Sequence, residues 1–552
     1  MHVGLDRPVA ASGITDASAG APSAWSPLGH PVFRILWIAT IVANVGTWVH
    51  DIAATWLMTS LAPSPLMVAL VQTAGTLPVL MLALPAGVLA DVLDRRHVLL
   101  FAQVWMTVVA LVLGAVTFVG ATTPLVLLVL TFLLGIGTAL TAPAWQSIVP
   151  ELVPKAELGA AVTLNSAGIN VARAVGPALG GLVVAGLGPA SAFALNGVSF
   201  AGVIAVLLWW KRAVPAAALP PERLTSAFGT GLRFVRHEPR LIAVLMRTLA
   251  FIVFGSALWA LLPLIARQRL GTGALGYGLL LGAIGVGALL GTAVLPVARR
   301  RLSADRVVTL ATLAYAAVVV ATGSLDDYAA MLFVLLAGGA AWLMLLATFQ
   351  AGAQLAVPSW VRGRALAVYL MVFFGGQAAG ATVWGTVASQ VGISRTLLLA
   401  SGGLVLGLLA VRRYPLGSSE RLDLAPSRHW PAHDPSVMAA GERDSRPVLV
   451  VTEYHIAAGD AVAFGTAIDA LRLARLRSGA VRWELFQDLD VPGRHVEHFL
   501  VPSWNEHLRQ HERITGVDHA AQEAVRALNA GNTPPTVTHF VMDAPPMPPI
   551  SA

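Results

Sequence analysis

Three charged residues stand out inside long apolar stretches of this chain: Asp51, Arg173 and Arg247. A charge in hydrocarbon costs several kcal/mol unless it is paired or hydrated, so such residues usually have a function. Desolvation raises the pKa of a carboxyl group, and a nearby arginine lowers it. We therefore predict that Asp51 binds a proton or attracts a cation, with either arginine as partner. The alternative is a permanent ion pair between helices. For Arg247 we favour a structural role, because a residue near the start of its stretch can reach water.

Uncharged polar and aromatic residues in the same stretches could line a cavity. Taken one at a time, each is more simply explained as a group that bonds one helix to another within the membrane. Taken together, they are the candidates for a binding surface. They are Asn44, Trp48, Trp56, Gln72, Asn165, Asn170 and Gln377.

The composition separates a membrane region from a soluble one. Of the 552 residues, 56% are hydrophobic and only 12% are charged, against roughly 25% charged in an ordinary soluble domain. The apolar stretches fall within residues 31–415. The chain has no cysteine, which excludes disulfides, thiolate metal sites and a catalytic thiol. We predict no cofactor and no metal. The net charge is +7, but the basic residues lie mostly beside apolar stretches, as they do in the cytoplasmic loops of membrane proteins. Nucleic acid is therefore not an expected partner.

Twelve stretches are long enough to cross a bilayer, which needs roughly 20 apolar residues in a fully hydrogen-bonded helix. They lie near 33–60, 65–90, 98–120, 124–148, 158–186, 189–210, 241–266, 274–297, 306–323, 328–356, 365–391 and 395–413. The loops that follow even-numbered stretches hold most of the basic residues, whereas the other loops hold Arg267, Arg269 and Arg395. This asymmetry predicts a multi-pass protein of the plasma membrane with both termini in the cytoplasm.

The two halves of the apolar region align without a gap at an offset of 204 residues. Gly87 then pairs with Gly291, Arg95 with Arg299, and the later glycines follow in register. An internal duplication is the simplest explanation. Six crossings per copy preserve the topology, so we predict parallel repeats with a substrate path between them.

Residues 87–96 read Gly-Val-Leu-Ala-Asp-Val-Leu-Asp-Arg-Arg and connect the second and third stretches. This segment resembles the loop signature of the major facilitator superfamily, with Val92 and Asp94 departing from it. Gly87, Asp91, Arg95 and Arg96 match. A carboxylate at a helix end can accept bonds from another helix's N-terminus and from an arginine, which predicts a gate. The alternative is a packing turn that sets topology.

Three further segments and the soluble tail resemble the transmembrane secretion effector family, which includes proteins similar to enterobactin exporters. The segments are 46–51, 84–87 and 170–177. The resemblance implies a major facilitator fold and efflux of a drug, siderophore or other secondary metabolite by proton antiport. The arginine that often serves drug–proton antiporters in the fourth stretch is absent, because residues 124–148 contain no charge.

A glycine-rich segment of the fifth stretch resembles the antiporter signature of this superfamily, with Ala172 in place of its first glycine. Its matching residues are Gly176, Pro177, Gly180 and Gly181. Small residues allow helices to approach closely and to bend. A bend for transport and plain tight packing are equally good interpretations.

The tail after residue 446 follows a β-α-β-β-α-β pattern, which is typical of ferredoxin-like domains. We expect strands at 448–454, 481–488, 494–501 and 537–542, a helix at 460–477 and a helical region after Ser503. The tail resembles antibiotic biosynthesis monooxygenase-like domains, which implies pairing of two copies. A sensory, dimerising or regulatory role is preferred over oxygenase activity, since no catalytic constellation is present.

Several side chains of the tail are of types that could bind a metal or line a pocket. His507 and His511 lie one helical turn apart beside Glu506 and Glu512, which would suit a metal if a third ligand were specified. A solvated helix face is the favoured interpretation. A pocket between sheet and helices could be lined by Trp483, Arg494, His495 and His498.

Taken together, the sequence predicts an all-α polytopic membrane protein of twelve transmembrane helices in two six-helix repeats, followed by a small α+β ferredoxin-like domain. Its expected partners are the lipid bilayer, a small-molecule substrate and protons. A membrane-anchored enzyme or sensor, whose tail modifies or binds a lipophilic metabolite, is the alternative. The expected parts are a cytoplasmic tail without regular structure (1–30), two helix bundles (31–210 and 241–415), a linker with an amphipathic helix on the membrane surface (211–240), a second linker (416–446) and the soluble domain (447–545).

Overall fold

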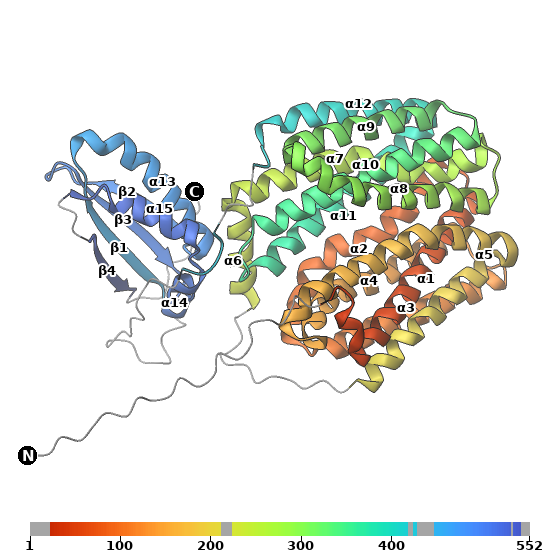
Figure 1. Ribbon diagram of the computed structural model, residues 1–552, viewed down its shortest axis with the longest axis horizontal. Helices are drawn as coiled ribbons and strands as arrows, with labels where there is room; N and C mark the ends of the chain where they lie inside the picture. The colour runs from red at the N-terminus through yellow and green to blue at the C-terminus, as the bar shows by residue number, and fades with distance from the viewer. Residues whose placement is uncertain (1–22, 211–223, 418–422, 428–445, 531–533, 543–552) are drawn as a thin grey trace, which may run out of the picture.

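A bundle of long helices and a small α+β domain make up the computed structural model of this chain (Figure 1). It describes residues 23–210, 224–417, 423–427, 446–530 and 534–542. The predictions for residues 1–22, for 211–223 and for most of the linker 416–446 lie outside the described residues.

Within the described residues, eleven helices are long and apolar enough to cross a membrane. Several begin at a proline or after a side-chain cap such as Asp94, Ser303 or Asp327, which satisfies a free N–H of the first turn. The helices are α1 (Pro31–Leu61), α2 (Pro65–Val92), α3 (Arg95–Phe118), α4 (Pro124–Leu152), α5 (Leu158–Trp209), α7 (Pro239–Leu264), α8 (Ala274–Arg301), α9 (Ala304–Ser324), α10 (Tyr328–Leu355), α11 (Arg362–Val391) and α12 (Ile393–Ala410).

The helix α5 is interrupted near its middle. It has 52 residues, and Gly188 in it takes the non-helical angles φ 81° and ψ 168° before Pro189. An L-residue with a side chain rarely adopts this positive φ, which glycine tolerates. The part after the break packs against α1, since Gly46 of α1 approaches Ser199. Gly392, between α11 and α12, takes similar angles, φ 85° and ψ 161°.

Two groups of helices form the bundle, α1–α5 (the first half) and α7–α12 (the second half), as Figure 1 shows. They meet through α5 against α8 and α2 against α11. A Cβ added to Gly181 would lie 2.7 Å from the carbonyl oxygen of Ala274, and one added to Gly385 would lie 2.6 Å from the Cβ of Ala69. The halves therefore touch nearly backbone to backbone.

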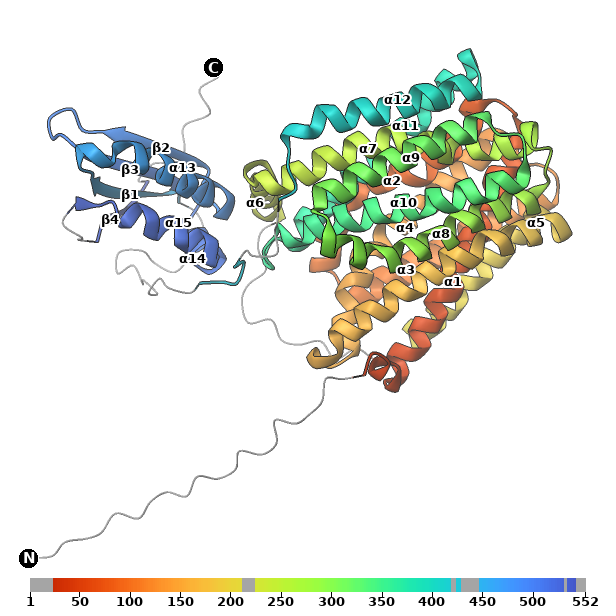
Figure 2. The same cartoon turned by 45° about the horizontal axis from the view of Figure 1, so that its top comes forward.

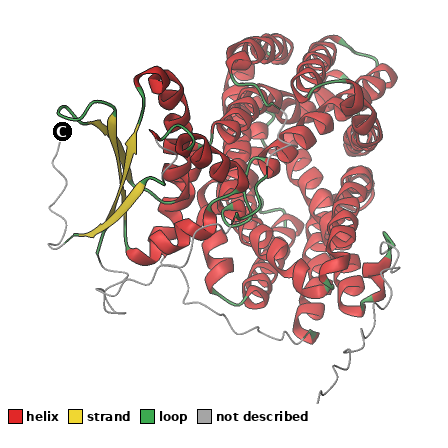
Figure 3. Ribbon diagram, turned by 60° about the vertical axis from the view of Figure 1, so that its left-hand side comes forward, coloured by secondary structure: helices red, strands yellow, loops and turns green. Residues whose placement is uncertain are grey.

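The soluble domain contains one antiparallel sheet in the order β2-β3-β1-β4. Its helices lie between this sheet and the bundle (Figure 3). One part of its core contains Val448, Val450, Phe499, Val501 and Trp504, and a second part lies around Phe464 and Leu471 of α13. The elements are β1 (Val448–His455), α13 (Ala461–Ser478), β2 (Arg482–Gln487), β3 (Arg494–Val501), α14 (Trp504–Arg513), α15 (Gly516–Arg526) and β4 (Thr536–Val541), each within about two residues of its expected place.

Helix α6 (Leu224–His237) lies between the soluble domain and the bundle (Figure 2). It is amphipathic, as predicted, and it is in contact with other parts of the protein on two sides. It packs against both α11 and α13, and Thr230, Phe234 and Val235 are buried there. The apolar side of α6 was expected to face lipid, whereas the soluble domain covers it in part, a contact that a local sequence pattern cannot reveal.

Candidate functional site

A cavity of about 400 Å³ lies between the two halves of the bundle. It is lined by side chains from α1 to α5 of the first half and from α7, α8, α10 and α11 of the second. This volume falls within the range of small-molecule sites, roughly 300–1,000 Å³. The cavity is where a substrate path between repeats was expected.

Five of the predicted residues line this cavity: Trp48, Asp51, Gln72, Arg173 and Gln377. The Asp51 side chain is exposed to it, from the middle of α1, and Arg173 reaches it from α5. Among the ion pairs of the described residues, none joins Asp51 to Arg173. Both charged groups are therefore available to whatever occupies the cavity.

The other polar and aromatic candidates do not line the cavity. Asn165 accepts a hydrogen bond from Trp145 Nε1 at 3.3 Å, which joins α5 to α4. Trp56 stacks on Tyr277 of the second half with ring centroids 6.0 Å apart. Asn44 and Asn170 are half-buried in α1 and α5. Asn165 thus forms a hydrogen bond between two helices, and Trp56 packs across the interface between the halves.

Arg247 lies away from the cavity, in an ion pair between α7 and α9. Its Nη2 is 2.8 Å from Asp305 Oδ1, and its Nε donates to the carbonyl oxygen of Tyr414 at 2.6 Å. The arginine is buried. Its partner is Asp305 and not Asp51, so it fastens α7 to α9 and to the chain that leaves α12.

The residues of the expected gate lie at one end of the first half. Gly87 and Asp91 belong to the last turns of α2, and the side chain of Asp91 is outside the description. Arg95 Nη1 contacts Glu151 Oε1 of α4 at 2.8 Å. Arg96 Nε donates to the carbonyl oxygen of Leu207 at 2.5 Å. Both arginines thus tie the start of α3 to helix ends of their own half.

The glycine-rich segment of α5 is a contact surface on two sides. A Cβ on Gly176 would lie 2.6 Å from that of Trp48 in α1, and one on Gly180 would lie 3.0 Å from the Cα of Val49. Gly181 faces α8 instead. Pro177 lies between them within the helix, and the non-helical angles of α5 occur only at Gly188 among its described residues. The geometry of this segment is that of close packing.

Sequence reasoning missed several lining residues, among them His50, Asn196, Trp259, Tyr277 and Trp342. His50 could have been found, because it is a titratable residue inside an apolar stretch. Its ring lies 4.8 Å from that of Phe193, and neither ring nitrogen has a hydrogen-bonding partner among the residues that the structure describes. The aromatic residues carry no such signal, since apolar stretches contain many rings that only pack.

In the soluble domain, the expected solvated face at His507 and Glu506 is wrong, because both side chains are buried. His507 Nε2 lies 3.1 Å from His539 Nε2 and 3.2 Å from His511 Nε2. Burial and these neighbours lower the pKa of His507 to about 3. Within the described part of the chain, no set of three possible ligands is placed to hold a metal ion.

The expected pocket residues of the tail are used in structural contacts. Trp483 Nε1 donates to the buried Glu497 at 2.8 Å, and His495 packs on Phe464 with ring centroids 4.9 Å apart. Arg494 pairs with Glu453 at 2.8 Å. His498 packs on Phe486, with ring centroids 5.1 Å apart. The His495 contact joins the sheet to α13, and the other three contacts join neighbouring strands.

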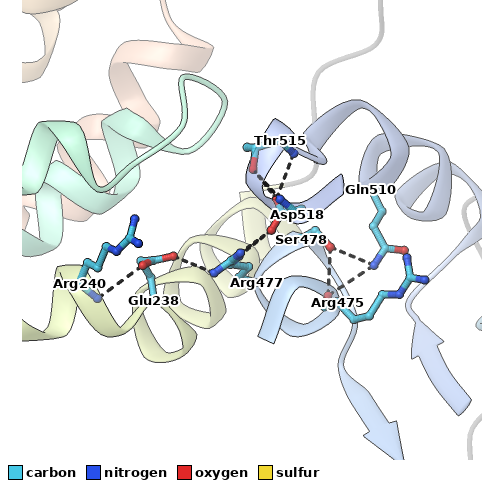
Figure 4. A network of polar contacts seen from close by, with 8 residues as sticks. All are labelled: Glu238, Arg240, Arg475, Arg477, Ser478, Gln510, Thr515 and Asp518. Carbon is cyan, nitrogen blue, oxygen red and sulfur yellow. Dashed lines mark hydrogen bonds and ion pairs between the residues drawn. The ribbon is translucent and has the colours of Figure 1, made fainter. Parts of the chain in front are cut away.

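The soluble domain is joined to the second half of the bundle by a buried polar network (Figure 4). Arg477 of α13 bonds Asp518 of α15 and lies 3.0 Å from Glu238, the residue that caps α7. Nearby, the guanidinium group of Arg513 lies 4.7 Å from the ring centre of Trp360, which follows α10. The soluble domain thus contacts both the start of α7 and the segment that connects α10 to α11.

The comparisons with known proteins agree with this architecture. Residues 22–546 match the model of the family described as transmembrane secretion effector, a range that includes the soluble domain. Among curated relatives, the multidrug efflux pump Tap of Mycolicibacterium fortuitum is 26% identical over 69% of this chain and 95% of its own length. The Tap pump of Mycobacterium tuberculosis is 28% identical over 72% and 96%.

Other relatives match over a shorter range. An uncharacterised MFS-type transporter of Bacillus subtilis, YfiS, is 28% identical over 39% of this chain, and the match spans only 53% of that relative. Among solved structures, a bacterial homologue of the lysosomal transporter Spinster, described as inward-facing and occupied, superposes with a TM-score of 0.57 at 14% identity. It covers 71% of this chain and 98% of that structure, a likeness of fold alone.

Proposed function

Because this chain belongs to the transmembrane secretion effector family, we propose that it exports a small molecule by alternating access in exchange for protons. The observation that carries the proposal is the cavity between the halves, which Asp51 and Arg173 both line without an ion pair between them among the described residues. The efflux activity of the Tap relatives supports the direction. The cargo is a drug, siderophore or other secondary metabolite, and the chain is not an enzyme.

The proposal includes twelve crossings in two repeats. Helix α5 would be about 80 Å long if it were straight, more than twice the hydrocarbon thickness. Its break at Gly188 divides it into two segments that can each cross. Gly392 lies 204 residues later with nearly the same φ and ψ, which is the offset of the sequence repeat. The charge asymmetry of the loops supports cytoplasmic termini in a bacterial inner membrane.

Asp51 is proposed as the proton carrier, because a carboxylate that faces a cavity can be reached by water and by substrate in turn. In this mechanism, the side chain is protonated when the cavity opens to the outside and releases its proton to the cytoplasm after the substrate has left. Arg173, in the same cavity, favours the ionised form when it approaches. Arg247 takes no part, since Asp305 neutralises it.

The soluble domain is proposed to be ferredoxin-like and to have a sensory or dimerising role. The sheet order β2-β3-β1-β4 supports the fold. The face of the sheet that points away from the bundle exposes Phe486 and Phe540, which supports pairing with a second copy (Figure 3). The mass of the intact chain in detergent micelles tests this: a monomer for both the natural chain and Phe540→Glu would remove the dimer from the proposal.

The experiment that tests transport uses the intact chain in liposomes with an imposed pH gradient and a panel of candidate compounds. We expect gradient-driven flux of at least one compound, and flux without gradient dependence for Asp51→Asn. The control is Asp469→Asn, which removes a carboxylate from the exposed side of α13. Unchanged coupling in Asp51→Asn would exclude this carboxylate as carrier. Turnover of a compound without flux would replace the exporter by a membrane-anchored enzyme.

A further inference from the structure

The walls of the central cavity differ in chemistry. Its ionisable residues, His50, Asp51 and Arg173, come from the first half, apart from the weakly acidic Tyr277. The second half contributes mostly rings, namely Trp259, Tyr277, Trp342, Phe373 and Phe374. A molecule that fills the space therefore meets polar groups on one side and aromatic faces on the other.

The polar wall is rich in hydrogen-bond acceptors. Thr47 and Thr76 line it, and their hydroxyl groups donate to the carbonyl oxygens one turn earlier, of Ala43 at 3.0 Å and of Gln72 at 2.8 Å. A hydroxyl group has a single proton, so each of these oxygens can only accept from the cavity. Thr138, also in the lining, donates to Leu134 at 3.3 Å in the same way.

Other groups of this wall strengthen the same preference. The ionised carboxylate of Asp51 accepts only. Arg173 is the one strong donor among the charged groups of the lining. Buried polar groups are normally hydrogen-bonded, so this wall favours an occupant that can donate.

The opposite wall favours a planar, apolar occupant. Trp259 and Trp342 have ring centroids 5.4 Å apart, and Phe373 and Phe374 have centroids 5.1 Å apart. Phe251 and Tyr315 support Trp342 from behind, at 5.2 and 5.4 Å. Rings that are held in this way offer aromatic faces and edges at fixed positions, which suit another flat ring.

We infer that the substrate class of this cavity is a planar aromatic molecule whose polar end carries several N–H or O–H donors. Its ring packs on the second half, and its donors bond Asp51, Thr47 and Thr76 of the first. The inference rests on the proposed function, because it assigns the occupant of the proposed transport site. Net charge does not select the substrate, since Asp51 and Arg173 have opposite charges in the same space.

Two dyes with the same ring system test this preference. Proflavine and acridine orange are both planar and cationic at neutral pH, but the exocyclic nitrogens of proflavine carry hydrogens, whereas those of acridine orange carry methyl groups. Binding is measured by dye fluorescence with the intact purified chain in micelles and no pH gradient. The readout is the affinity for each dye, so it does not depend on transport.

Removing acceptors should affect one dye only. In Thr47→Val/Thr76→Val, the shape is kept and two acceptors are lost, so we expect the affinity for proflavine to fall about ten-fold or more, with little change for acridine orange. The matched control is Thr163→Val, whose hydroxyl group also donates one turn back, to Gly159 at 2.9 Å, but lies outside the cavity lining. It should change neither affinity.

Removing a ring should affect both dyes. We expect Phe373→Leu to weaken proflavine and acridine orange equally, by about five-fold. Its control is Phe333→Leu, because Phe333 is 75% exposed on the outside of the bundle. Equal losses of both dyes in the threonine double variant, or the same dye affinities in every variant, would overturn the inference. So would a wild-type chain that binds neither dye, and the gradient experiment would then still decide whether the chain exports another compound.

Discussion

Arg477 Nη1 lies 3.0 Å from Glu238 Oε2, and this contact links the soluble domain to the residue that caps α7. Burial raises the pKa of the Glu238 carboxyl group, and the charge of Arg477 opposes that shift. The same arginine bonds Asp518. One guanidinium group therefore contacts two buried carboxylates on different parts of the chain.

The first prediction is that Arg477→Met releases the soluble domain from the bundle. Removing one partner of a buried ion pair costs about 3–5 kcal/mol, because the other charge is left buried. Since the chain has no cysteine, spin labels can be placed at Val462 and Leu355 alone. We expect a narrow distance distribution in the natural chain and a broad one in the variant.

The control for this prediction is Arg472→Met, on the same helix. Arg472 pairs only with Asp469, one turn away, among the described residues, and its side chain is partly exposed. We expect the distance distribution of this variant to match that of the natural chain. A broad distribution in both variants would mean that any change in α13 loosens the domain.

The second prediction concerns the contact between the halves. In Gly181→Ala, the new methyl group would lie 2.7 Å from the Ala274 carbonyl oxygen, so α5 and α8 must separate. Overpacking of this kind costs about 1–3 kcal/mol, and we expect a lower melting temperature in micelles. In Gly186→Ala, on the same helix, nothing lies within 4 Å of the new methyl group. Alanine favours a helix more than glycine does, so a similar loss in that control would mean that the contact with α8 is not the cause.

The third prediction is that Arg247→Gln destabilises the protein without changing proton coupling. It leaves Asp305 without its ion-pair partner and the Tyr414 carbonyl oxygen without its donor, which costs about 2–4 kcal/mol. Thermal unfolding and gradient-driven flux are measured on the same preparation. The control is Arg306→Gln, an exposed arginine on α9. If the flux of Arg247→Gln no longer depended on the pH gradient while its stability was unchanged, Arg247 would belong to the proton pathway.

The fourth prediction is that acid destabilises the soluble domain through His507. The pKa of its imidazole is lowered to about 3 by burial, whereas that in an unfolded chain is about 6.5. Between these values the unfolded domain binds a proton that the native domain does not, so stability falls as the pH drops below about 6.5. We expect a loss of up to about 1.4 kcal/mol per pH unit.

Pulse proteolysis of the intact chain in urea, with cleavage scored inside the soluble domain, measures this dependence between pH 7 and pH 5. His507→Gln should be less stable at pH 7 but less sensitive to acid. His455→Gln, at an exposed position of β1, should behave as the natural domain does. An unchanged acid dependence in His507→Gln would assign the effect to other groups.

The sequence determined the elements of this protein because each depends on nearby residues. A helix in hydrocarbon must bond its own backbone, so apolar length alone marked the stretches, and alternation marked the strands of the tail. Asp51 and Arg173 could be selected one at a time, since each is a charge in an apolar stretch.

Only the tertiary structure decided which of these residues meet. Arg247 forms an ion pair with Asp305 and not with Asp51, because α7 packs beside α9. His507 contacts His539, which is 32 residues later in the chain, because β4 pairs with β1 in the sheet. The apolar side of α6 packs in part against the soluble domain. Each partner is distant in the chain, and its position depends on how whole helices and strands pack, which no local pattern encodes.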